Sequence, residues 1–227
     1  EFDELPELTQ PIEVSAQEEG KPQYIEGNPV GGTAEVGQYR PEFKENIIQQ
    51  GKETKVILPD GTVHRAVYVL APINSVLASH DPNNGFRGTE GYPVDASGNT
   101  TNDRDYQKDN SAQTDVQRIA ANPNFDLYID QGQSVNVGPP TITQDGFVVG
   151  GSGRKQAMDL FSPNQRTAMG RAIENKQEEF GFSEENMRQI KMPAMQTGGV
   201  GLFRMLVDYN EPYSKTASAA FNQSEGK

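Results

Sequence analysis

The residues best suited to chemistry lie in one short stretch, FVVGGSGRKQAM at residues 147–158. Its apolar start predicts a buried strand, its glycines a tight turn, and the segment after Gly153 the beginning of a helix. Helix N-termini present unpaired N–H groups and a partial positive charge, so they accept anions. Glycines let the backbone approach a phosphate closely, and Arg154 offers a bidentate fork. We interpret this stretch as an anion-binding turn.

The two cations of the stretch stand in the predicted first turn of the helix. Positive side chains there oppose the helix dipole, and a bound anion would compensate Arg154 and Lys155 for that placement. The alternative is an ordinary strand-to-helix turn with both side chains solvated. The spacing matches neither a P-loop nor a dinucleotide-binding fingerprint.

A second group of candidates lies in a long polar segment upstream. His80 stands beside Asp81 and could act as a general base or a metal ligand, or it could close the loop by a hydrogen bond. Asp103, Arg104 and Asp105 could pair with the glycine turn or bind substrate, or could form an exposed charged run. With two histidines and no cysteine, the chain excludes a three-histidine zinc site, a disulfide and a cysteine nucleophile.

Charge and composition narrow the classes of function. The net charge of −12 over 227 residues argues against phosphate binding across the whole surface. Residues 1–60 hold 13 acidic against 5 basic side chains, whereas residues 151–176 are locally basic. No apolar run approaches the roughly 18–20 residues that span a bilayer. Because the chain begins at Glu1 rather than Met and has no signal peptide, we expect a fragment of a larger polypeptide, cut by cloning or by a protease.

The hydrophobic periodicity and the turn residues predict the elements that must position these candidates. Residues 1–52 lack periodicity and predict an acidic, largely irregular arm, with order beginning near Lys55. Residues 55–70 predict a hairpin around Asp60–Gly61, and a second strand pair surrounds Asp145–Gly146. The polar, turn-rich segment 79–110 separates the first hairpin from the helix that precedes Pro123.

The second half of the chain is predicted to be helical. Ser162 and Gln165 form a capping box with Pro163 at the first helical position, and Gly181 is placed to cap a C-terminus. Ser183 predicts the start of a short helix through about residue 190. Residues 192–198 predict a short strand and residues 201–210 an amphipathic helix, while the Ser/Thr/Ala-rich end is marginal as structure.

These motifs together resemble the ParB/sulfiredoxin-like superfamily, specifically its DdrB-like branch, known from polyvalent proteins of phages and plasmids. VVGGSGRKQAM resembles the strand–turn–helix motif in which that branch carries Gly-Asn-Gly-Arg. ASHDPNNGF, GYP and NDRDYQKDN resemble its Ser-His-Asp loop, its Tyr-Pro element and its Gln-Pro-Arg-Asp-Arg segment. The resemblance runs in order over roughly residues 53–225.

The departures from the family pattern bear on function. Ser152 stands where the branch has Asn, which puts an Asn-specific role in doubt but keeps a hydrogen-bonding group. Asn102 and Asp103 replace Gln-Pro before Arg104, and the second arginine of that segment is absent. Sulfiredoxin chemistry needs a cysteine, so the cysteine-free chain excludes it.

The resemblance implies an α+β ParB/sulfiredoxin-like domain over residues 53–227, with a small mixed sheet, a helical second half and the extended acidic arm at residues 1–52. It implies phosphate binding, to a nucleotide or nucleic acid, in DNA processing or host-defence evasion by a mobile element. The implied phosphate contacts are Gly151, Ser152, Gly153 and Arg154, assisted by Lys155 and Arg104.

The implied cofactor is a nucleoside triphosphate with magnesium, and the alternative is that the domain uses no cofactor. The implied partners are a nucleotide or DNA and other domains of a parent polypeptide, with no membrane, in a bacterial host cytoplasm or a phage particle. A metal-dependent nuclease, for which Asp81, Asp103 and Asp105 would have to converge, is the enzymatic alternative. A nucleotide hydrolase is the other enzymatic alternative. The catalytic residues of either enzyme are unassigned, with His80 and Asp81 as weak candidates. A non-catalytic scaffold or virion component is the structural alternative.

Overall fold

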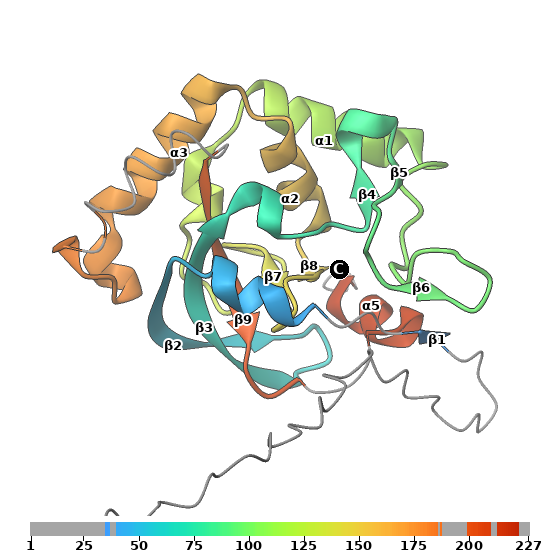
Figure 1. The fold of residues 1–227 in the computed structure, drawn as a ribbon, viewed down its shortest axis with the longest axis horizontal. Coiled ribbons are helices and arrows are strands. Elements are labelled where there is room, and N and C mark those ends of the chain that lie inside the picture. Colours follow the sequence, from blue (N-terminus) through green and yellow to red (C-terminus); the bar gives the residue numbers. More distant parts are fainter. Residues whose placement is uncertain (1–34, 37–39, 186, 188–198, 210–212, 223–227) are drawn as a thin grey trace, which may run out of the picture.

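The computed structural model describes residues 35–36, 40–185, 187, 199–209 and 213–222. Over these residues the chain forms a five-stranded mixed sheet with four α-helices (Figure 1). The α+β class predicted from the sequence is therefore confirmed.

The order of strands in the sheet is not their order in the chain. From one edge to the other the strands are β2 (Gln49–Ile57), β3 (Val63–Pro72), β9 (Val200–Leu206), β7 (Thr141–Ile142) and β8 (Val148–Gly150). Neighbouring strands run antiparallel, except that β9 and β7 are parallel. Both predicted hairpins are present, as β2–β3 and β7–β8, and they are joined through β9.

Four helices are present among the described residues: α1 (Asn110–Ala121), α2 (Ser152–Asp159), α3 (Pro163–Asn175) and α5 (Lys215–Asn222). The first ends before Pro123, as predicted, and the Asp109 side chain caps its start by accepting from the Ala112 N–H. The capping box of Ser162 and Gln165 before α3 is confirmed. None of the helices in the described part of the chain is long and apolar enough to cross a bilayer.

Short elements complete the fold. Two small antiparallel pairs, β1 (Glu35–Val36) with β6 (Val94–Asp95) and β4 (His80–Asp81) with β5 (Arg87–Gly88), lie outside the main sheet. The 3-10 turns are η1 (Pro41–Asn46), η2 (Ile73–Ser75), η3 (Pro82–Asn84), η4 (Phe125–Tyr128) and η5 (Gln177–Phe180). Gly181 adopts the left-handed conformation that ends η5, the capping position predicted for it.

The sheet buries apolar side chains on both faces, and β8 shows the division. Val148 belongs to the larger cluster, which includes residues of α1, α2 and α3, whereas Val149 belongs to a smaller cluster with Phe221 of α5. The polar segment 79–110 is anchored by Phe86, Tyr92 and Tyr106, each at most 4% exposed. This segment is therefore folded onto the domain, because its few aromatic side chains are buried.

Two predictions for the C-terminal part are corrected. Residues 200–206 form the central strand β9, not part of an amphipathic helix, and all seven are buried. A run with both faces buried suits a strand covered on each side, and in so short a segment the helical and strand patterns are hard to separate. The Ser/Thr/Ala-rich end contains a formed helix, α5, held by Phe221 at 2% exposure. The strand predicted at residues 192–198 and most of the helix predicted after Ser183 lie outside the described residues.

Order begins earlier in the chain than Lys55. The sheet takes in residues 49–52, and Phe43 of η1 is fully buried in the larger cluster. A single phenylalanine in a polar segment gives no periodic signal, so its insertion into the core is decided by tertiary contacts. Residues 1–34 and 37–39 of the predicted arm lie outside the described residues, and the division of the chain at residue 52 stays a prediction.

The two predicted Asp-Gly turns differ in what surrounds the glycine. Gly61 and Gly146 both have positive φ, at 87° and 78°. A Cβ on Gly146 would lie 2.5 Å from Cδ2 of the buried Phe43, whereas a Cβ on Gly61 would meet nothing within 4 Å.

We expect Gly61→Ala to lower the free energy of unfolding by about 1–2 kcal/mol, the cost of a left-handed alanine. Gly146→Ala should cost about 2 kcal/mol more, because overpacking against Phe43 adds to the same backbone strain. Urea denaturation of the two variants measures the difference. Equal losses would show that Phe43 does not pack against this turn.

Candidate functional site

The strand–turn–helix arrangement predicted at residues 147–158 is confirmed. Strand β8 ends at Gly150, Gly151 adopts a left-handed conformation (φ 78°, ψ 30°), and α2 begins at Ser152 with no side-chain cap. The positive φ favours glycine here, and a Cβ on Gly151 would also displace the Arg154 guanidinium, since it would lie 2.7 Å from Nη2. The uncapped first turn leaves backbone N–H groups for another acceptor.

Arg154 does not extend from the first turn into solvent. Its Nη1 donates to the Asn136 carbonyl at 2.6 Å and its Nη2 to the Val135 carbonyl at 3.3 Å. Its Nε is buried and has no hydrogen-bond partner. Burial lowers the pKa of this guanidinium. Two backbone carbonyls therefore hold the Arg154 guanidinium, and its contact with an anion stays a prediction.

Lys155 lies away from the glycine turn. Its side chain is buried, and Nζ bonds to Oδ1 of Asp159 at 2.5 Å, one turn further along α2. The Asp159 carbonyl in turn accepts from the Asn83 side chain of η3. Burial lowers the pKa of Lys155, and Asp159 opposes that shift. The structure places this ammonium in an internal ion pair, not beside Gly151.

The polar segment approaches the turn through Tyr106. The Tyr106 hydroxyl lies 3.5 Å from the position that a Cβ on Gly153 would take. Arg104 lies next to it, with Cζ 5.9 Å from the centre of the Tyr106 ring. In contrast to Arg154, Arg104 is exposed and forms no ion pair within the part of the chain that the structure describes. Arg104 is therefore an accessible cation beside the glycine turn, whereas Lys108, which is also exposed, is paired with Asp105.

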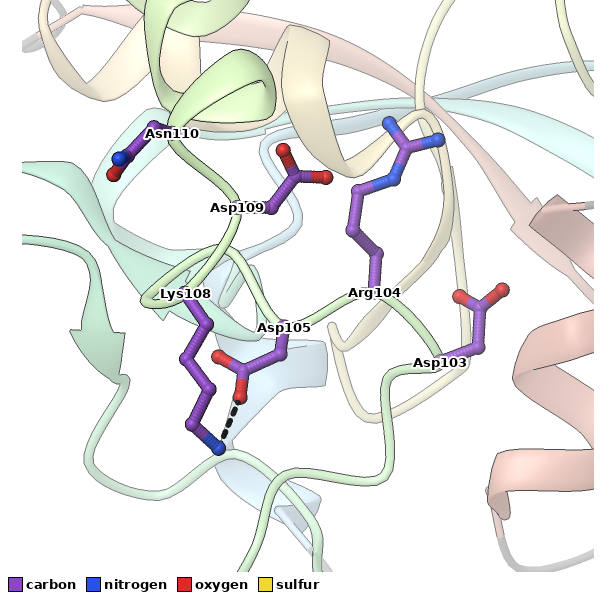
Figure 2. A pocket seen from close by; sticks show the side chains of 6 residues that line it. All are labelled: Asp103, Arg104, Asp105, Lys108, Asp109 and Asn110. Carbon is purple, nitrogen blue, oxygen red and sulfur yellow. Dashed lines mark ion pairs between the residues drawn. The ribbon is translucent and has the colours of Figure 1, made fainter.

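Arg104 projects into an open pocket of about 680 Å³ (Figure 2). The lining side chains are Asp103, Arg104, Asp105, Lys108, Asp109 and Asn110. Figure 2 shows the guanidinium of Arg104 and the carboxylate of Asp109 on the same side of the segment, whereas Lys108 points away and pairs with Asp105 at 2.9 Å. Lys108 is the main cause of the lowered pKa of Asp105.

His80 and Asp81 do not act as a pair. The His80 ring is 4% exposed, with Nδ1 2.9 Å from the Ser79 hydroxyl and Nε2 3.6 Å from Oδ1 of Asp105. Asp81 instead accepts from the Asn83 N–H and caps η3. Burial lowers the pKa of His80, although Asp105 opposes the shift. His80 therefore lies beneath the pocket segment between Ser79 and Asp105, and a catalytic role for it stays a prediction.

The carboxylates considered for a nuclease have separate partners. Asp81 caps η3, Asp105 pairs with Lys108, and Asp103 bonds to Ser218 and Asn222 of α5. Among the described residues, no group of three His, Asp or Glu side chains is arranged to hold a metal ion.

The sequence analysis missed Arg204, in the middle of β9. This side chain is 0% exposed and donates to five backbone carbonyls of the loop that follows η4, those of Gly132, Ser134, Val135, Val137 and Pro139. Burial, followed by the charge of Arg154, lowers its pKa to about 10, so it stays protonated at neutral pH. The signal available in the sequence was a lone charge inside the apolar run GLFRML.

Arg204 and Arg154 share the Val135 carbonyl. The distances from their Nη2 atoms to that oxygen are 3.4 and 3.3 Å. No ion pair joins either guanidinium to a carboxylate within the described ranges. Two permanent positive charges therefore lie behind the N-terminal turn of α2, and they add to the positive end of the helix dipole.

Two polar residues of α2, Ser152 and Gln156, point into the interior, which the sequence pattern did not indicate. Both are buried, and the Ser152 hydroxyl and both amide atoms of Gln156 have no hydrogen-bond partner in the structure. Their spacing places them on the same face of α2. Buried polar groups are nearly always satisfied, so this face has unused capacity for a ligand or water.

The mixed sheet with this strand–glycine turn–helix at its edge defines an α+β domain whose glycine turn faces a polar loop. The family model of the ddrB-like ParB superfamily domain matches residues 59–195, more than half of the chain. The protein therefore belongs to the ddrB-like ParB superfamily. No curated protein and no solved structure matches it. The matched range includes the glycine turn and Arg104, whereas β9 and α5 lie beyond it.

Proposed function

We propose that the N-terminal turn of α2 binds a phosphate group of a nucleotide or nucleic acid. The observation that carries the proposal is the coincidence of an uncapped helix start with two guanidinium groups, the partly buried Arg154 and the buried Arg204, that have no carboxylate bonded to them. An anion at the turn would accept from the free N–H groups of residues 151–153 and would be attracted by both charges.

Three further groups fit a phosphate at this position. The Ser152 hydroxyl is buried without a partner, and leaving such a group unsatisfied costs about 1–3 kcal/mol. The Tyr106 hydroxyl lies over Gly153. Arg104 is exposed beside it and can reach an oxygen that the turn leaves open. We assign direct contacts to Gly151, Ser152, Gly153 and Arg104, and a supporting role through Val135 and Asn136 to Arg154.

Lys155 is left out of the direct contacts because its ammonium group forms an ion pair with Asp159. The phosphate of the implied nucleoside triphosphate fits this set of contacts. Magnesium bound to the nucleotide would neutralise part of the phosphate charge. None of the contacts assigned here depends on the metal.

The setting proposed for this activity is DNA processing or host-defence evasion by a phage or plasmid, within a larger polyvalent polypeptide. Support for that setting is the superfamily membership together with the resemblance of the motifs. Partners would be the nucleotide or DNA and neighbouring domains of the parent polypeptide. The metal-dependent nuclease has no supporting cluster of carboxylates in the described part of the chain.

Arg104→Ala tests the assignment directly. A charge-assisted contact contributes about 1.5–3 kcal/mol, so the variant should bind about ten- to a hundredfold more weakly than wild type. Isothermal titration with ATP, CTP, inorganic phosphate and a short DNA duplex measures this and separates free nucleotide from nucleic acid. The melting temperature should not change, because Arg104 is exposed.

Arg118→Ala is the matched control. Arg118 is an exposed arginine of α1 that pairs with Asp115 of its own helix, and its loss should leave binding intact. Wild-type protein that binds none of the four probes at millimolar concentration would rule out the phosphate site, and a non-catalytic scaffold would become the leading function.

A further inference from the structure

Helix α5 lies against the edge of the sheet that carries the glycine turn (Figure 1). Phe221 packs in the smaller apolar cluster with Val149 of β8, and the Tyr213 hydroxyl, just before the helix, lies 3.5 Å from the Val149 carbonyl. These contacts alone would dock the helix. They leave unexplained a polar side chain in the same interface, Ser218, which is 0% exposed.

Ser218 and Asn222 hold the start of the pocket segment. The Asp103 N–H donates to the Ser218 hydroxyl at 2.9 Å, and that hydroxyl lies 3.2 Å from Oδ1 of Asp103 and 3.3 Å from Oδ1 of Asn102. The Asn222 amide donates to Oδ1 of Asp103 at 3.1 Å and to the Ser218 carbonyl at 2.9 Å. One turn of α5 therefore fixes both the backbone and the carboxylate of Asp103.

The residue fixed next in the chain is Arg104. Its carbonyl accepts from the Asn102 side chain at 2.7 Å, and Asn102 is itself in contact with Ser218. On the other side, Asp105 is held by Lys108 and lies beside the buried His80. The backbone that carries the guanidinium is thus constrained on both sides, and this arrangement reduces the conformational entropy lost when a long side chain binds a ligand.

We propose that α5 is part of the phosphate site, with Ser218 and Asn222 as positioning residues that fix the segment from which Arg104 projects. The inference rests on the proposed function, and it extends the site beyond residues 59–195, the range that the superfamily model matches.

Asn222→Ala tests the inference in the full chain. We expect about three- to tenfold weaker binding of ATP and inorganic phosphate. Without Asn222, the conformational entropy of ordering the Arg104 side chain would be lost when the ligand binds. Asn222→Ala in the Arg104→Ala background should weaken binding no further, because the positioned group is gone. Hydrogen exchange at the Asp103 amide should be faster in Asn222→Ala than in wild type, with or without ligand.

Two further variants sharpen the result. Thr216→Ala, at an exposed position of the same helix, should bind like wild type. Asn222→Asp keeps the shape but puts a second carboxylate beside Asp103, so it should also weaken binding and serves if the alanine variant does not fold.

The two proposals fail in different ways. If wild type binds the probes and Arg104→Ala weakens binding, but Asn222→Ala and Asn222→Asp bind like wild type, the role of α5 is wrong and the phosphate site stands. Full additivity of the Asn222 and Arg104 losses would also overturn it. If wild type binds no probe, the phosphate site and the role of α5 both fall.

Discussion

Arg204→Met is expected to lower the free energy of unfolding by about 4–6 kcal/mol, a large share of the stability of a domain of this size. Methionine fills much of the volume but donates no hydrogen bond. Five backbone carbonyls in the loop of residues 132–139 would lose their donor while remaining inside the fold. Each buried acceptor left unsatisfied costs about 1–3 kcal/mol, although the losses are not additive.

The loop of residues 132–139 should become mobile before the whole domain unfolds. The Arg204 side chain ties that loop to the central strand, and backbone hydrogen bonds with Ile57 tie it to β2. Val135 is also a contact of Arg154 beside the glycine turn. We therefore expect faster hydrogen exchange in this loop and weaker phosphate binding in the variant. Urea denaturation and exchange of the same sample measure both effects.

Arg65→Met is the matched control, since Arg65 lies on the neighbouring strand β3 with its side chain 62% exposed and paired to Glu53. Its loss should change stability by no more than about 0.5 kcal/mol. Arg204→Lys should recover little, because an ammonium cannot present donors to both sides of the loop as the guanidinium fork does. A stable Arg204→Met variant would show that the loop is held by other contacts.

Lys155→Met should be the second most damaging change, with a loss of about 3–5 kcal/mol near neutral pH. The variant leaves the carboxylate of Asp159, with 21% of its side chain exposed, without its cation. Asp159→Asn removes the partner instead and should also destabilise, whereas the double variant should recover part of the loss because no unpaired charge remains.

The loss in Lys155→Met should depend on pH in one direction. Burial raises the pKa of Asp159 and Lys155 opposes that shift, so removing the lysine should raise the pKa further. A carboxyl group whose folded pKa lies above its unfolded value contributes stability at low pH that is lost as pH rises through the folded value. The difference in free energy of unfolding between wild type and Lys155→Met should therefore widen between about pH 4 and about pH 8. A gap that narrows over this range would contradict the assigned ion pair.

The sequence by itself determined the local elements. The two Asp-Gly turns, the helix ending before Pro123, the capping box at Ser162 and the strand–glycine turn–helix at Gly151 are set by neighbouring residues, so their signals are readable without a structure. The same motifs were sufficient to indicate the superfamily, because they occur in the right order along the chain.

The tertiary structure alone decided how the charged side chains are used. Arg154, Lys155 and Arg104 look alike in the sequence, but one is tied to carbonyls, one is in a buried ion pair and one is exposed. These outcomes depend on burial and on partners far along the chain, for which a local pattern carries no information.

The placement of β9 and α5 was likewise decided by long-range contacts. The run GLFRML is consistent with either a helix or a strand, and only pairing with β3 and β7 selects the strand. Arg204 can be buried there because the carbonyls of residues 132–139 surround it, and Ser218 of α5 reaches Asp103 across 115 residues of chain. The sequence thus determined which elements form, whereas burial and distant hydrogen bonds determined which of their polar side chains remain free to bind a ligand.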